Sequence, residues 1–144
     1  MILYRTDDFN HDSSTTDLVS VINYELVTRE NEELFQSISQ YLETPNEIAG
    51  YSLEVFRKAL EVNNKGILDD IVSSIIKELQ RKSHKELKHA VWLYTQENVE
   101  NYYSFEGIDV MIDGYEASDV CLISYPNEGA LYAYEENPKI TERV

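Results

Sequence analysis

Carboxylates and tyrosines are concentrated in the stretch from His89 to Pro138. It holds ten carboxylates, seven of the eleven tyrosines of the chain, and no lysine or arginine. Carboxylates fixed on a folded surface can occupy the phosphate-binding groove of a basic protein. Tyrosines add apolar contact area at low entropic cost, as binding hot spots often do. The chemistry that this stretch predicts is therefore binding of a protein partner and not catalysis.

We expect eight residues of this stretch to contact the partner. These partner-binding candidates are Asp109, Asp113, Tyr115, Glu116, Asp119, Glu128, Tyr132 and Glu135. An ordinary solvated face mixes charges of both signs, so the absence of any base from the stretch favours an interaction surface. The alternative is that the acids form the wet face of a half-buried sheet and the tyrosines its core and rim.

The overall charge restricts the class of partner. The chain of 144 residues carries 27 carboxylates against 12 lysines and arginines, a formal net charge of −15. Such a charge opposes direct binding to nucleic acid or to anionic membranes and favours a basic partner. The length is typical of one domain with one core, residues 1–144. A single cysteine, Cys121, and the lack of a signal or membrane-spanning segment predict a cytoplasmic protein.

A basic run from Lys77 to His89 interrupts the acidic pattern. A basic helix can bind nucleic acid, but Glu78 and Glu86 break this run and no aromatic platform is interleaved with it. We interpret the run as the solvated end of a helix, which could also pack against the acids of the same chain.

Metal binding and catalysis have little support in the sequence. Asp8, Asn10 and Asp12 match the first ligands of a calcium loop, but Val19 stands where the bidentate glutamate is required. A polar capping loop is predicted instead, and a weak divalent site within residues 8–17 stays open. The histidines form no metal or nucleophile motif, and Cys121 is expected to be a small buried residue. We predict no enzyme activity, no metal and no cofactor.

Periodicity predicts an α+β domain. A helical body of four or five helices, about residues 15–103, precedes a three-stranded antiparallel β-meander at about 107–136 and a tail at 139–144. Helices are expected after a cap within residues 14–17, after Thr28, after Pro45 or Gly50, over residues 67–82, and from His84, where Ser83–Glu86 matches a capping box.

Strands are expected at residues 108–112, 120–125 and 130–134. Pairing the last two sets Ile123 opposite Tyr132 and Cys121 opposite Tyr134. The sequence also allows a short N-terminal strand at Ile2–Tyr4.

The resulting hypothesis is an acidic inhibitor that occludes the nucleic-acid groove of a basic, nucleic-acid-processing partner, in the manner of an anti-CRISPR or anti-restriction protein. One alternative is an immunity protein against a nuclease toxin. Another is a homo-oligomeric interaction module without mimicry, such as a homodimer, in which the charge only maintains solubility.

Overall fold

Polar caps start the helices of this chain. The computed structural model describes residues 2–6, 17–95, 97, 111–116, 121–123, 130–135 and 140–143. In each of the four α-helices that lie wholly within the described residues, a side-chain oxygen before the first turn accepts a hydrogen bond from a backbone N–H three residues later, which satisfies a donor that the helix leaves unpaired. The helices are α1 (Leu18–Ile22) after Asp17, α2 (Glu32–Tyr41) after Asn31, α3 (Leu53–Glu61) after Ser52 and α4 (Lys65–Ser83) after Asn64.

Residues other than glycine adopt the left-handed backbone conformation directly after the helices. Glu30, Glu43, Asn63 and His84 have φ values of 50°, 65°, 53° and 58°. Glu30 follows η1 (Asn23–Thr28), a π-helix that continues α1. Glycine is the usual residue at this position because a Cβ atom costs free energy there. The ends near Glu43, Asn63 and His84 agree with the sequence, where Pro45, the run Asn63–Gly66 and the predicted helix limit at residue 82 mark them, whereas the end at Glu30 has no such signal.

A two-residue turn shapes the connection between α2 and α3. The strands β2 (Glu47–Ile48) and β3 (Tyr51–Ser52) pair antiparallel, with Ile48 opposite Tyr51. The two residues between them, Ala49 and Gly50, have φ values of 50° and 86°. Positive φ at both positions defines a type I′ turn, in which asparagine or glycine normally takes the place of Ala49.

Replacing Ala49 by asparagine should therefore stabilise the protein. Asparagine tolerates the left-handed region, so we expect the free energy of unfolding to rise by about 0.5–1 kcal/mol, as measured by urea denaturation. Ala49→Val is the opposing variant, because a β-branched side chain is strained at positive φ. Equal stability of the two variants would contradict this description of the turn.

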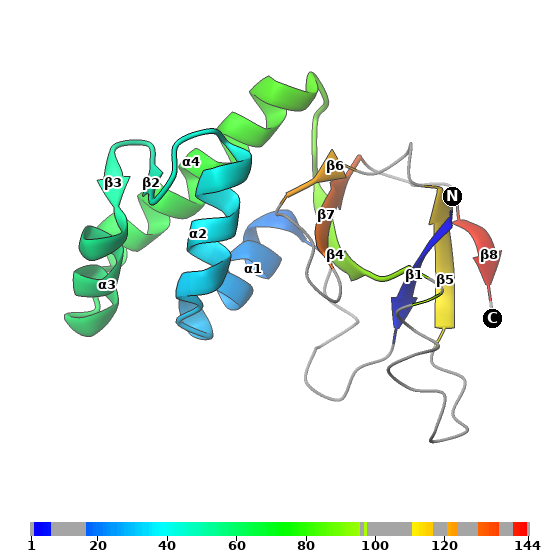
Figure 1. Ribbon diagram of the computed structural model, residues 1–144, viewed down its shortest axis with the longest axis horizontal. Coiled ribbons are helices and arrows are strands. Elements are labelled where there is room, and N and C mark those ends of the chain that lie inside the picture. The colour runs from blue at the N-terminus through cyan, green and yellow to red at the C-terminus, as the bar shows by residue number, and fades with distance from the viewer. Residues whose placement is uncertain are drawn as a thin grey trace.

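The main core lies between the helices and one sheet. Phe35 of α2 and Phe56 of α3 are fully buried and stacked, with ring centroids 4.7 Å apart. The same apolar cluster includes Ala90, Ile123 and Leu131 from the sheet of β4 (His89–Leu93), β7 (Ala130–Tyr134) and β6 (Cys121–Leu122). The sheet is thereby packed against the helical half of the molecule (Figure 1).

A second sheet lies on the far side of the first. Its strand order is β1 (Ile2–Thr6), β5 (Met111–Glu116) and β8 (Ile140–Arg143), all antiparallel. Reciprocal backbone hydrogen bonds of 2.8 and 2.9 Å between Tyr4 and Tyr94 connect β1 to the chain just after β4. The helices thus lie at one side of the molecule and this sheet at the other (Figure 1).

The mixture of helices and antiparallel sheets is roughly the predicted α+β class, but the order of elements differs. The N-terminal strand is confirmed. The helix predicted from His84 is wrong, because His84 ends α4 and His89–Leu93 form β4. Residues on both faces of β4 are buried or half-buried, which removes the alternation that identifies a strand.

The predicted three-stranded meander is also wrong. β5 pairs with β1 and β8 and not with β6, and the predicted tail contains β8. β6 and β7 do form an antiparallel pair, but their register is shifted by one residue from the prediction. Cys121 lies opposite Ala133, and Leu122 opposite Tyr132. A shift of one residue moves every side chain of one strand to the opposite face of the sheet, relative to its partner strand.

Candidate functional site

The partner-binding candidates are divided between the two sheets. Asp113, Tyr115 and Glu116 belong to β5, whereas Tyr132 belongs to β7 and Glu135 follows it. Asp109, Asp119 and Glu128 lie outside the described residues, as does the loop predicted to bind a weak divalent ion up to residue 16. Among the described candidates, Glu135 is solvent-exposed. The acidic surface is therefore not built on one continuous meander.

Asp113 of β5 is paired with an arginine on each of the two neighbouring strands. Its Cα partner is Arg5 on β1 and Arg143 on β8. Arg5 and Arg143 come from opposite ends of the sequence, which is otherwise poor in bases outside residues 29–88. The register therefore places Asp113 between two arginines, one from each neighbouring strand.

The tyrosines of β7 contribute to a second, smaller core. Tyr134 is 5% exposed and forms a cluster with Leu3 and Leu93, against which the half-buried Tyr132 packs. Burial raises the pKa of Tyr132. The ring of Tyr134 also stacks on His89, with centroids 5.1 Å apart. These positions resemble the core-and-rim alternative more than an exposed aromatic surface.

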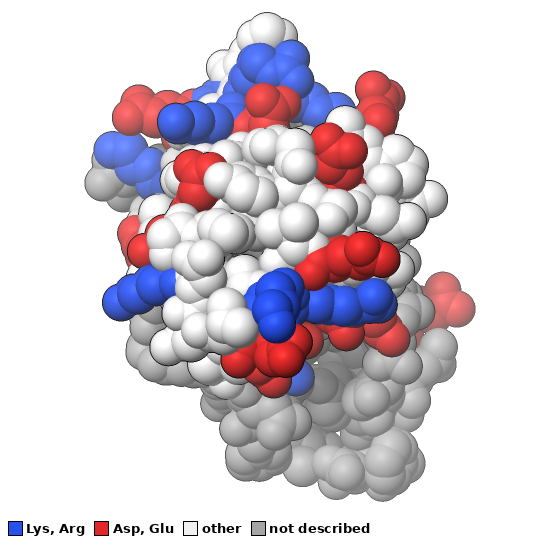
Figure 2. Space-filling view, turned by 90° about the vertical axis from the view of Figure 1, so that its left-hand side faces the viewer, with Lys and Arg blue, Asp and Glu red and all other residues white. Residues whose placement is uncertain are grey.

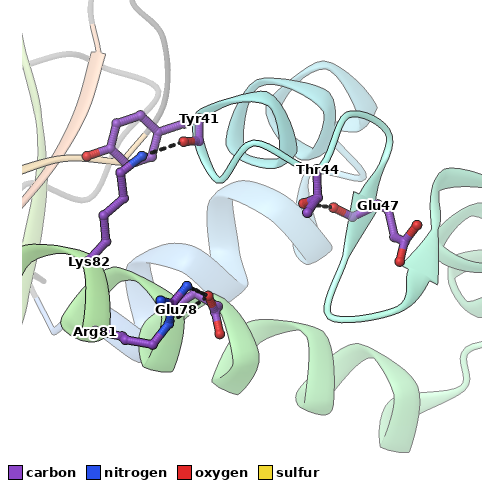
Figure 3. Close-up of polar contacts among 6 residues, drawn as sticks. All are labelled: Tyr41, Thr44, Glu47, Glu78, Arg81 and Lys82. Carbon is purple, nitrogen blue, oxygen red and sulfur yellow. Dashed lines mark hydrogen bonds and ion pairs between the residues drawn. The ribbon is translucent and has the colours of Figure 1, made fainter.

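Several cations of the basic run make local contacts at the end of α4. The Arg81 guanidinium contacts the Glu78 carboxylate at 2.5 Å, one turn earlier on the same helix. The Lys82 ammonium donates a hydrogen bond of 2.7 Å to the Tyr41 carbonyl and lies 4.0 Å from the centroid of the Tyr41 ring (Figure 3). Tyr41 is the last residue of α2, where helix carbonyls lack partners in the helix. Lys82 therefore connects the ends of α2 and α4.

Replacing Lys82 by methionine should lower the free energy of unfolding by about 1 kcal/mol, because both the charged hydrogen bond and the cation–π contact are lost. The matched control is Lys77→Met, an exposed lysine of the same helix. We expect it to change stability by less than about 0.5 kcal/mol. The measurement is urea denaturation of both variants. Equal losses of unfolding free energy would show that the contacts of Lys82 with Tyr41 do not stabilise the packing of α2 on α4.

Two polar arrangements in the helical half were not predicted from the sequence. Glu25 is 3% exposed within η1, and its carboxylate accepts a hydrogen bond of 3.3 Å from Arg29. The four-residue spacing was a visible signal for this pair, but nothing local indicated burial. The Tyr51 hydroxyl donates a hydrogen bond of 2.6 Å to Asp70 of α4, and this bond raises the pKa of Tyr51.

Between α2 and β2, the Thr44 hydroxyl donates a hydrogen bond of 2.7 Å to the Glu47 carbonyl (Figure 3). This bond lies within the connection that leads into the β2–β3 turn. The bond orders the backbone of the connection between α2 and α3.

The histidines, the cysteine and the carboxylates of the described residues form no metal site. Within the described ranges, no three His, Cys, Asp or Glu residues are grouped so that they could hold a metal ion. His84 is exposed at the end of α4, His89 is half-buried in β4, and Cys121 is half-buried in β6. No described helix is both long enough and apolar enough to cross a membrane.

Comparisons with known proteins give no relative. No family model, no curated protein and no solved structure matches this chain.

Proposed function

We propose that the protein is a non-catalytic acidic inhibitor, which binds a basic nucleic-acid-processing partner and occludes its nucleic-acid groove. The inhibitor would be of the anti-CRISPR or anti-restriction type. The supporting observation is that charge is divided along the fold. Residues 17–88, the helical half, contain thirteen carboxylates and nine lysines or arginines. Residues 89–144, whose described elements are strands, contain eleven carboxylates and two bases.

The contacts within the helical half support this division. Four of its nine bases form ion pairs with acids of the same half: Arg29 with Glu25, Arg57 with Glu32, Lys58 with Glu61, and Arg81 with Glu78. The ammonium of Lys82 is directed to Tyr41 of α2. The contacts of these five bases lie within the helical half. Their charges are therefore not paired with the excess carboxylates of residues 89–144.

The proposed mechanism is stoichiometric occlusion. Complementary charge accelerates encounter with a basic groove, and bound carboxylates then occupy the places of phosphates. Association should weaken as salt is added, because exposed charges are screened beyond about 8 Å at physiological ionic strength. Glu135 is exposed directly after β7, as such a contact requires.

The test is capture of partners from a lysate of the host with the tagged full-length chain, followed by stepwise elution with salt. We expect a nuclease or another nucleic-acid-binding protein, and we expect added DNA or RNA to compete with the tagged chain for it. If the captured protein binds nucleic acid and the tagged chain at the same time, the occlusion mechanism is wrong.

A further inference from the structure

We draw no further inference here: the strongest candidate, the cluster of lysines and arginines over residues 77–88 at the carboxyl end of α4 (Figure 2), is accounted for in part by the fold itself, because Arg81 pairs with Glu78 and Lys82 binds the Tyr41 carbonyl at the end of α2, and nothing in the part of the chain that the structure describes shows what would cover the rest of it.

Discussion

Replacing Phe56 by alanine is expected to lower the free energy of unfolding by about 3–5 kcal/mol. Phe56 is 0% exposed and stacks on Phe35, so truncation removes both burial and an aromatic contact at the junction of α2 and α3. Because small domains are stable by only about 5–15 kcal/mol, a loss of this size should be visible as a large shift of the urea midpoint.

The control for Phe56 lies on the same helix. Val62→Ala removes an exposed side chain and should change stability by less than about 0.5 kcal/mol. A Phe56→Ala loss below about 1 kcal/mol would mean that the core between α2 and α3 is not packed as described.

Neutralising three acids, by Asp109→Asn, Asp119→Asn and Glu135→Gln together, is expected to weaken partner binding by roughly 100-fold, or about 3 kcal/mol. Asp113 is left unchanged because it is a strand residue whose register partners in the sheet are Arg5 and Arg143. The measurement is titration calorimetry with the captured partner at physiological salt.

A second triple variant tests whether the affinity depends on the location of the carboxylates or on the net charge of the protein. Glu43→Gln, Glu47→Gln and Glu86→Gln remove three exposed carboxylates from the helical half, so both variants have the same formal charge. We expect the helical-half variant to bind within a few-fold of wild type. Equal losses in the two variants would mean that affinity depends on total charge alone, and the candidate surface would be wrong.

The limits of the helices were predicted from the sequence to within a few residues, from caps at their starts and helix-breaking residues at their ends. Capping acts over three residues, so the cap of α1 at Asp17 could be predicted locally. The left-handed conformation of Glu30, Glu43 and His84 after the helices could not be predicted, because the usual signal for it is glycine. The two-residue hairpin was missed for the same reason, since Ala49 is an unusual residue for its turn.

The strands were harder to assign, because their pairing depends on distant residues. Sequential strands usually pair, which favoured a meander, but β5 lies between β1 and β8, from opposite ends of the sequence. Burial on both faces made β4 resemble a helix. The acid-rich composition of the candidate surface could be predicted from the sequence. The register of Asp113 with two arginines could not, because it arises only when the sheet forms.

The most direct test of the occlusion mechanism is a titration of the captured partner's nucleic-acid binding with the full-length protein. The partner is held at a concentration well above its dissociation constant, and binding of labelled DNA or RNA is followed by fluorescence anisotropy. Occlusion predicts a linear loss of nucleic-acid binding that is complete at a fixed stoichiometric ratio and is reversed by excess nucleic acid. A partner that is saturated with the protein and still binds nucleic acid with unchanged affinity would contradict the account.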